Sequence, residues 1–402
     1  MCSERACPAL GGEAALNPGA AVFVKYRSGL TGAASQPSAG QARSLQVVET
    51  LKGPAMNNNK RPTIATVAAQ AGLSVATVDR VLNARAPVNP QTAEQVFQAA
   101  EAVGYFAARL IGQRIRERRP TYRFGILLLA TAQAFYASLA QAISDAAALH
   151  AGANLTCQFE YIVDRTPSAI VAQIEQLAVQ CDGLAVVSFA HPLINATLKQ
   201  IREAGVPVVA LLSDIHEHAA EPYVGQDNHV VGRTMGWLLA RTCGARKGSV
   251  GILLGGHRFL GHQARVEGLH SYLAEHAPGL KPLEPLINLD NSDITEEATL
   301  DLITRHNDLR GLCVVGGGGD GIINALAQLP KRPALCCILQ ESTALSRDAL
   351  RQGLIDVVMD SQPRQTAKAL IELLVELQDG EAFDPVRHRV HIPPQIVTSE
   401  NL

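Results

Sequence analysis

Six short apolar runs, separated by longer stretches with helical periodicity, constrain the fold of this chain most strongly. All of them lie after residue 122, and they read FGILLLA, GLAVVSF, VPVVALL, SVGILLG, GLCVVGG and ALCCILQ. Nearly every position in each run is apolar, which is typical of parallel strands that helices cover on both faces. Strands that alternate with helices in this way predict a doubly wound α/β body, and their number allows two similar halves.

The first 120 residues differ from this body in composition and charge. Residues 1–56 are rich in Gly, Ala, Ser and Pro without periodicity, so we interpret them as a disordered leader. Met56 is followed by NNNKRPTIATVA and is an alternative natural start, which would make the leader non-native. Residues 57–120 carry nine Lys/Arg against four Asp/Glu, a net charge of +5, whereas residues 121–402 carry 21 against 30, a net charge of −9. A basic head on an acidic body predicts an anion-binding module joined to a different one.

The cysteine and histidine patterns argue against a disulfide scaffold or a metal site. The eight cysteines include no C-x-x-C pair, which favours a reducing cytoplasm. His216 and His218 in DIHEH could bind a metal, but solvated loop histidines are far commoner, so we expect no metal and no cofactor. The sequence has no run of about 18 apolar residues, and its start lacks an export signal, so we expect no membrane partner.

Residues 63–105 have the pattern of three short helices. Thr63 can cap the first, Gly72 is suited to end it, and Ser74 can cap the second. Asn89 can cap the third. Two helices joined by a turn of a few residues predict a helix-turn-helix, although an unrelated three-helix packing element gives the same pattern.

The second of these helices carries side chains suited to double-stranded DNA. Ser74 and Thr77 lie near its start, where free N–H groups and the helix dipole favour a phosphate. Val75, Ala76 and Arg80 fall on its open side. Arg80 is long enough to reach guanine O6 and N7, a contact that gives about 1–3 kcal/mol of base discrimination.

The stretches TIATVAAQAGLSVATVDRVLN and VNPQTAEQVFQAAEAVGY resemble the DNA-binding head of the LacI/GalR family of bacterial transcription regulators. The resemblance runs without a gap from Thr63 to Tyr105. It implies that Val75 and Ala76 select bases together with Arg80, and that Ser74, Thr77 and Asn83 hold the DNA backbone. These contacts are expected from the resemblance, and the DNA operator it implies is palindromic and bound by a homodimer.

Three positions depart from that family. Asp79 stands where serine is usual, and an acid near phosphates weakens binding. Ala107 and Ala108 replace an expected Pro-Asn pair. The family's hinge helix inserts a leucine into the minor groove; a straight count places Arg114 there, with Ile115 as the nearest apolar wedge. The RIRERR run that contains Ile115 can instead be a solvated linker.

The resemblance continues more weakly from Arg123 to about Pro394, with the pattern of type I periplasmic sugar-binding proteins. It implies two lobes joined by three crossovers, with a small ligand between them. The expected domains are a leader (1–56), a helix-turn-helix head (57–106), a hinge or linker (107–122), and an effector-binding and dimerisation domain (123–402), with lobe 1 at about 123–227 plus 363–389 and lobe 2 at about 228–362 plus 390–402.

Ligands of such sheets bind beyond the carboxyl ends of the strands, which gives six candidate contacts. They are Phe135, Tyr136, Asp214, Asp227, Arg265 and Gln362. The aromatic pair can stack on a sugar ring, Asp214 can accept two hydroxyl hydrogens, and Arg265 matches the family's R-x-x-G. Each has a structural alternative, such as core packing for Phe135 or an ion pair for Arg265. Asp320 and Glu341 are weaker candidates because their surroundings depart from the family, which leaves a sugar or polyol as the default ligand.

GLCVVGGGGDG raises a competing possibility. Gly316, Gly318 and Gly321 have G-x-G-x-x-G spacing after a strand, and Glu341 follows about twenty residues later, as in a dinucleotide-binding unit. No hydride-transfer acid or base accompanies it, and four consecutive glycines produce such matches easily.

The sequence therefore predicts a ligand-responsive, sequence-specific DNA-binding transcription regulator. We expect a cytoplasmic homodimer that represses carbohydrate or related small-metabolite genes, responds to a sugar or polyol, and is not an enzyme. The alternatives are a periplasmic-type sugar-binding receptor, which the missing export signal and basic head oppose, and a dinucleotide-dependent enzyme.

Overall fold

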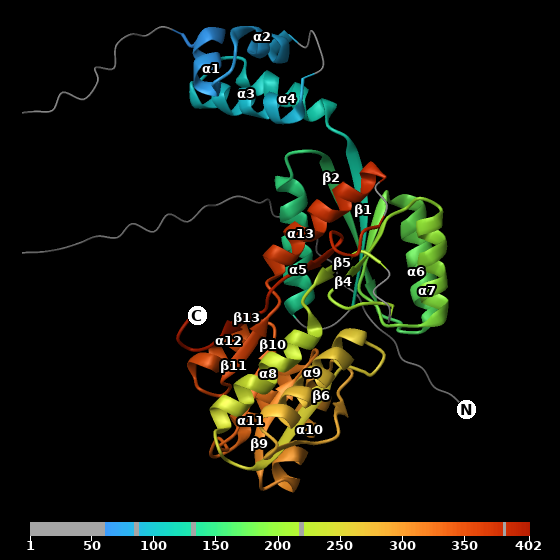
Figure 1. Ribbon diagram of the computed structural model, residues 1–402, viewed down its shortest axis with the longest axis vertical. Helices are drawn as coiled ribbons and strands as arrows, with labels where there is room; N and C mark the ends of the chain where they lie inside the picture. The colour runs from blue at the N-terminus through green and yellow to red at the C-terminus, as the bar shows by residue number, and fades with distance from the viewer. Residues whose placement is uncertain (1–60, 84–87, 130–133, 217–220, 381–382) are drawn as a thin grey trace, which may run out of the picture. The chain divides into compact units, whose positions relative to one another are not determined.

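The computed structural model describes residues 61–83, 88–129, 134–216, 221–380 and 383–402 of the protein (Figure 1). The leader expected at residues 1–56 lies outside these ranges. Among the described residues, no helix combines the length and apolar character needed to cross a membrane.

Four helices build the head. They are α1 (Ile64–Ala71), α2 (Val75–Asn83), α3 (Pro90–Ala102) and α4 (Ala108–Arg118). Thr63 caps α1 by accepting a hydrogen bond from Thr66 N (3.3 Å), and Gly72 ends the helix at a φ of 65°. Val67 and Val78 are fully buried in one apolar core that the helices share. The apolar residues of the three predicted helices thus meet in one core, as expected. This core stabilises the head, because short helices gain most of their stability from packing.

The stretch expected as a hinge or linker, residues 107–122, contains α4. This helix packs against α3, since Ile111 is 3% exposed within the head core. Gly112 lies against the ring of Phe97, where a larger side chain would overlap it. The side chain of Ile115, the expected minor-groove wedge, lies outside the described residues, so that assignment stays a prediction.

A six-stranded parallel sheet forms the first lobe. Its strands are β1 (Thr121–Leu129), β2 (Asn154–Ile162), β3 (Gly183–Val186), β4 (Val208–Leu211), β5 (Tyr223–Gly225) and β12 (Arg389–His391), in the order β12-β5-β4-β3-β1-β2. Figure 1 shows helices on both faces of this sheet. They are α5 (Ala134–Leu149) and α13 (Pro363–Glu376), with the short turn η1 (Leu377–Asp379), on one face, and α6 (Pro167–Gln180) and α7 (Pro192–Glu203) on the other.

The second lobe is a seven-stranded sheet with one antiparallel edge strand. The strands are β6 (Gly248–Leu254), β7 (Leu280–Pro282), β8 (Leu286–Ile287), β9 (Leu309–Val314), β10 (Cys336–Gln340), β11 (Val357–Asp360) and β13 (Gln395–Val397), ordered β13-β11-β10-β9-β6-β7 with β8 beside β6. Five helices cover it: α8 (Asn228–Cys243) and α9 (Leu260–His276) on one face, and α10 (Ser292–Arg305), α11 (Gly319–Gln328) and α12 (Ala344–Arg351) on the other.

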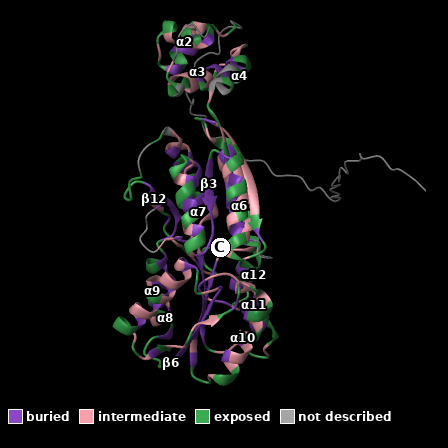
Figure 2. Ribbon diagram, turned by 90° about the vertical axis from the view of Figure 1, so that its right-hand side faces the viewer, coloured by how far each residue is buried: buried purple, intermediate pink, exposed green. Residues whose placement is uncertain are grey.

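The continuous apolar runs are explained by cores on both faces of each sheet. In β6, Ile252 packs with Met235 and Leu269 of α8 and α9, whereas Leu253 belongs to the opposite core with Leu302 of α10. Figure 2 shows the strands buried and the outer faces of the helices exposed. Neighbouring strand residues thus point into different cores, and both must be apolar. The doubly wound α/β prediction is confirmed.

The chain passes between the two sheets three times, after β5, after β11 and after β12. Hydrogen bonds join these crossovers to one another. Gln226 Nε2 donates to Asp360 O (3.0 Å), and Gln362 Nε2 donates to Pro393 O (2.6 Å). A movement of one lobe relative to the other must therefore bend these three crossover segments, which are hydrogen-bonded to one another.

Candidate functional site

The start of α2 is exposed and carries small side chains. Ser74, Val75 and Ala76 are exposed, and Val75 leaves 52% of its area accessible although it is apolar. Ser74 Oγ accepts a hydrogen bond from Thr77 N (3.1 Å) and lies 2.9 Å from Thr77 Oγ1. Such a helix end, with little side-chain bulk and free backbone donors, fits against a phosphate backbone.

Arg80 and Asn83 lie further along the same helix, and both are exposed. Asn83 Nδ2 donates a hydrogen bond of 2.6 Å to Asp79 Oδ1, one turn earlier. The acid that departs from the family pattern is therefore held along the helix by Asn83. A contact from Asn83 to the DNA backbone could use the second N–H of this amide.

A cavity of about 70 Å³ lies between the two lobes of the body. It is lined by Leu129, Phe135, Tyr136, Val187, Leu212, Ser213, Asn228, Phe259, Gly261, His262, Arg265, Asp290, Gly316, Gly317, Gln340 and Glu341. Aromatic and polar side chains meet there, because the lining residues follow the carboxyl ends of strands in both sheets. Of the six predicted ligand contacts, three line this cavity: Phe135, Tyr136 and Arg265.

Arg265, on α9, is the buried cation of this cavity, with 8% of its area exposed. Its Nε donates to Asn228 Oδ1 (2.8 Å), one terminal nitrogen donates to Val315 O (2.8 Å), and the other donates to Gln226 Oε1 (3.5 Å). Burial lowers the pKa of Arg265, and the nearby Glu341 raises it. Arg265 therefore fixes the loop after β9 and the first crossover against α9, in addition to lining the cavity.

The cavity lining also contains residues that the sequence patterns did not single out or ranked low. Burial lowers the pKa of His262 to about 4, so its ring is neutral near pH 7. Gln340 is 7% exposed, and its Oε1 accepts no hydrogen bond from the described residues. Burial and the neighbouring Asp360 raise the pKa of Glu341 to about 7. Gln340 Oε1 and the ionised form of Glu341 offer hydrogen-bond acceptors to a ligand, whereas the neutral His262 ring has one donor and one acceptor.

Asp290 connects the two lobes across the cavity. Its Oδ1 accepts a hydrogen bond from Gly317 N (2.9 Å), and its Oδ2 lies 3.3 Å from an Nη of Arg165, which follows β2 in the first lobe. The carboxylate side chain is 5% exposed, whereas that of Arg165 is 31% exposed. The pair thus holds the lobes together at the edge of the cavity.

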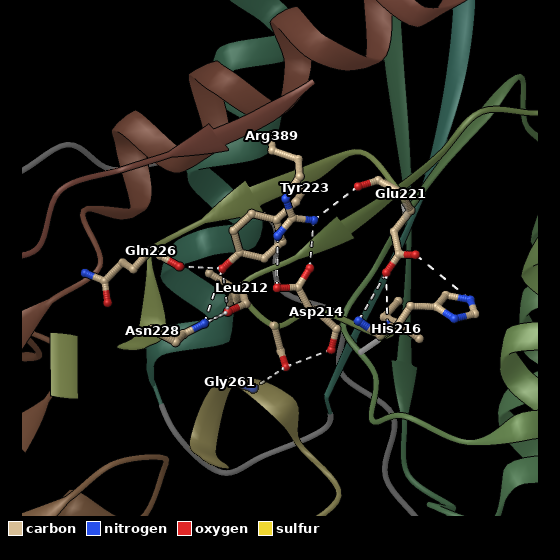
Figure 3. A network of polar contacts seen from close by, with 11 residues as sticks. Leu212, Asp214, His216, Glu221, Tyr223, Gln226, Asn228, Gly261 and Arg389 are labelled. Atoms are coloured by element: carbon tan, nitrogen blue, oxygen red, sulfur yellow. Dashed lines mark hydrogen bonds and ion pairs between the residues drawn. The ribbon is translucent and has the colours of Figure 1, made fainter. Parts of the chain in front are cut away.

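Asp214 is not among the cavity-lining residues. Figure 3 shows it beneath Arg389, whose two terminal nitrogens lie 2.9 and 3.0 Å from the two carboxylate oxygens. Arg389 also stacks over the ring of Tyr223 (4.8 Å to the ring centre) and donates to Glu221 O (3.3 Å). The carboxylate is therefore used to fix β12 to the first lobe, and we no longer propose it as a ligand contact.

Asp227 and Gln362 also lie outside the lining of the cavity. Asp227 caps α8 by accepting a hydrogen bond from Val230 N (3.0 Å). Gln362 precedes α13 with a φ of 53° and bonds the third crossover through Pro393. Both residues position the crossovers, so neither is kept as a proposed ligand contact.

Tyr223 is buried at the centre of the polar network in Figure 3. Removing its hydroxyl tests how much this network contributes to stability. The hydroxyl lies 2.7 Å from Gln226 O and 3.2 Å from Leu212 O. We expect Tyr223→Phe to lower the free energy of unfolding by about 1 kcal/mol, because buried carbonyls lose a donor. Urea unfolding measures this change. Tyr122→Phe is the matched control, since its ring packs on Phe124; an equal loss in both variants would contradict the role of the Tyr223 hydroxyl.

The three glycines that suggested a dinucleotide site are accounted for by packing of the protein itself. A side chain at Gly316 would meet the ring of His262, and one at Gly321 would overlap the backbone of Ser292 in α10. Gly318 has a φ of 88° and lies against Thr295. The loop after β9 thus forms a wall of the cavity and brings α11 close to α10.

Two family models match the chain. Residues 63–107 match the bacterial regulatory proteins of the lacI family, and residues 124–382 match the periplasmic binding protein domain. The two matches coincide with the helical head and with most of the two-lobed body.

Curated relatives are named as transcription regulators or repressors. Over 252 residues the chain is 29% identical to the HTH-type transcriptional regulator GalS of Salmonella typhimurium, covering 61% of this chain and 69% of the relative. It is 26% identical over 207 residues to the ribose operon repressor of Halalkalibacterium halodurans, covering 52% and 55% respectively. It is 25% identical over 170 residues to the HTH-type transcriptional regulator IdnR of Escherichia coli, covering 42% and 49%. The matches therefore span between about half and about two thirds of the length of these relatives.

Several solved structures resemble most of this chain. An ABC transporter solute-binding protein of Actinobacillus succinogenes with bound D-allose has a TM-score of 0.61 and 18% identity, covering 70% of this chain and 98% of that one. A solute-binding protein of Agrobacterium vitis with bound α-D-tagatopyranose has a TM-score of 0.62 and 20% identity, covering 70% and 95%. At these identities the likeness shows the fold. With a helix-turn-helix head followed by a periplasmic-binding-protein-like body, the chain belongs to the LacI/GalR family of bacterial transcription regulators.

Proposed function

We propose that the protein is a sequence-specific DNA-binding transcription regulator, acting as a repressor, whose DNA affinity is set by a small polyhydroxy effector. One observation carries this proposal: a single chain joins an exposed helix-turn-helix start to a two-lobed body with a polar cavity between its lobes. A transport receptor does not need a DNA-binding helix-turn-helix. The family is that of transcription regulators, and we assign the chain no catalytic activity.

The cavity is suited to a sugar or polyol. Phe135 and Tyr136 supply aromatic surface for the apolar face of a sugar ring, while Arg265, Gln340 and Glu341 supply hydrogen-bonding groups for hydroxyls. A volume of about 70 Å³ corresponds to roughly five to seven water positions, so the effector is small. The ribose repressor by its name, and the solute-binding proteins with sugars bound, support this class of ligand.

The regulator would act as a cytoplasmic homodimer on a palindromic operator. Two basic heads, each placing the start of α2 in the major groove, would read two half-sites related by the dimer axis. Arg80, with Val75 and Ala76, would contact bases, while Ser74, Thr77 and Asn83 would contact the backbone. The effector would change DNA affinity only if it binds the two lobe arrangements with different affinity.

The experiment that tests the proposal is selection of DNA from a random duplex library with the full chain, followed by titration of the selected site at increasing salt. We expect the selected site to bind about 10³-fold or more tightly than random duplex, with an affinity that falls steeply as salt rises. Addition of sugars and polyols, tested singly, should change this affinity. Equal affinity for selected and random DNA would contradict the proposed function.

A further inference from the structure

We propose that the interlobe cavity selects polyhydroxy ligands without negative charge, rejects phosphorylated and acidic sugars, and relies on Glu341 to enforce this choice. The inference rests on the proposed function, because it names the charge class of the effector of that same cavity. Four observations carry it: the balance of charges, the commitments of Arg265, the excess of acceptors, and the setting of Glu341.

The described lining of the cavity holds more acid than base. Its charged side chains are Arg265, Asp290 and Glu341, and an adjoining cavity of about 20 Å³ shares Glu341 and adds Asp320. Arg165 reaches Asp290 from outside the lining and is already paired with it. Residues 130–133, which the structure does not describe, read Ala-Thr-Ala-Gln and carry no charge. Arg165 thus balances Asp290, and Arg265 faces Glu341, so an anion would find no excess of positive charge in this site.

Arg265 is the one cation of the described lining, and an anion would have to compete with Glu341 for its charge. Three of its donors are bonded to Asn228, Val315 and Gln226, and its charge already faces Glu341. Sites for phosphate or carboxylate groups present several charge-assisted donors, often in a bidentate arrangement. A phosphorylated sugar would gain little from Arg265 and would meet two carboxylates.

Two acceptors of the cavity wall receive no donor from the described residues, and they lie beside the hydroxyl of Tyr136, which can donate as well as accept. Gln340 Oε1 accepts no hydrogen bond from the described residues although it is buried. Glu341 uses Oε2 to accept hydrogen bonds from Ser361 Oγ (2.7 Å) and Ser361 N (3.3 Å), and the structure shows no bond to its Oε1. Buried acceptors are costly without a donor. Hydroxyl and ammonium groups supply donors, whereas phosphate and carboxylate groups bring further acceptors.

Glu341 is held in place by its backbone and by Ser361. It follows β10 with a φ of 68°, an uncommon conformation for a residue with a side chain. Asp360 and Arg265 face its carboxyl, and His262, Asp290 and Asp320 share the cavities that it lines. Burial and Asp360 raise its pKa to about 7. It therefore gains negative charge as pH rises through neutrality, and the affinity for a cationic ligand should rise with it.

The test compares neutral sugars with their cationic and anionic derivatives. Isothermal titration with the full chain uses D-ribose, D-glucose and D-galactose, with the 2-amino-2-deoxy, 6-phosphate and uronic acid derivatives of both hexoses and ribose 5-phosphate. We expect binding only among the neutral and amino sugars, with the anionic form of any bound sugar at least about tenfold weaker, or about 1.4 kcal/mol. Tighter binding of an anionic form would overturn this inference and leave the proposed function standing. If none of these probes binds, the sugar effector of the proposed function is wrong, and this inference falls with it.

Glu341→Gln isolates the residue, because the amide still accepts a hydrogen bond from Ser361. Glu203→Gln is the matched control, since Glu203 is 65% exposed in its ion pair with Lys199. In the wild type, amino sugar affinity should rise several-fold from pH 6 to 7.5, within the limit of about tenfold per pH unit for one proton. Glu341→Gln should abolish this rise and reduce the neutral-over-acid preference. An unchanged profile and preference in a variant that binds neutral sugar normally would overturn the role of Glu341.

Discussion

Arg265→Met should unfold at a free energy about 3 kcal/mol below that of the wild type and should lose the effector response. The variant keeps most of the side-chain volume of Arg265, but it removes the donors to Asn228 Oδ1, Val315 O and Gln226 Oε1. Each buried acceptor left without a donor costs about 1–3 kcal/mol, partly offset because no charge is buried any longer. Urea unfolding gives the change in stability, and titration of sugar into the DNA complex gives the response.

Arg233→Met is the matched control for this prediction. Arg233, on α8, also forms short hydrogen bonds, to Glu275 Oε1 (2.9 Å) and Oε2 (2.8 Å), but its side chain is 33% exposed. Solvent screens an ion pair at the surface, so this variant should unfold almost as the wild type does. Equal stability losses in both variants would show that the buried bonds of Arg265 do not hold the loop after β9 and the first crossover in place.

The architecture of the body could be read from the sequence because its physical cause is local. An uninterrupted apolar run such as SVGILLG has one explanation in a soluble α/β pattern, namely cores on both faces of a strand, and β6 lies in that environment. The head could be predicted equally well, since Thr63 and Gly72 act as the caps that their residue types favour. The helix α4 was harder to foresee, because an Arg-rich run has the composition of a linker until Ile111 is seen to pack on α3.

The cavity was only partly predictable, because the sequence shows which side chains follow strands but not which way they turn. Phe135, Tyr136 and Arg265 line the cavity, whereas Asp214 follows β4 just as suitably and is paired with Arg389, 175 residues later. That partner begins β12, and no local pattern relates it to Asp214.

Some of the overlooked residues did carry a usable signal. His262 lies three residues before Arg265 on α9, and positions three apart share a helix face. Glu341 directly follows β10, at the strand end where ligands bind, but its departure from the family pattern lowered its rank. Had helical spacing and position at a strand end been the only criteria, both His262 and Glu341 would have been among the predicted ligand contacts.

Arg80→Ala should remove most of the preference of the protein for its operator over random DNA. Arg80 is exposed on α2, one turn beyond the Ser74–Thr77 start that we propose to contact phosphate. Loss of a guanine contact costs about 1–3 kcal/mol per half-site, and a dimer carries two such contacts. Discrimination should therefore fall by roughly 30-fold to 10⁴-fold, as measured by competition of selected and random duplexes in fluorescence anisotropy. Effector binding should be unchanged, because the cavity lies in the body.

Arg109→Ala separates base reading from charge. Arg109 is exposed on α4, so its removal also lowers the net charge of the head by one while α2 is untouched. This control should weaken operator and random DNA by the same factor, because phosphate contacts carry no sequence information. If Arg80→Ala also weakens both kinds of DNA equally, Arg80 contacts the backbone, and base selection has to come from Val75 and Ala76 at the exposed start of the helix.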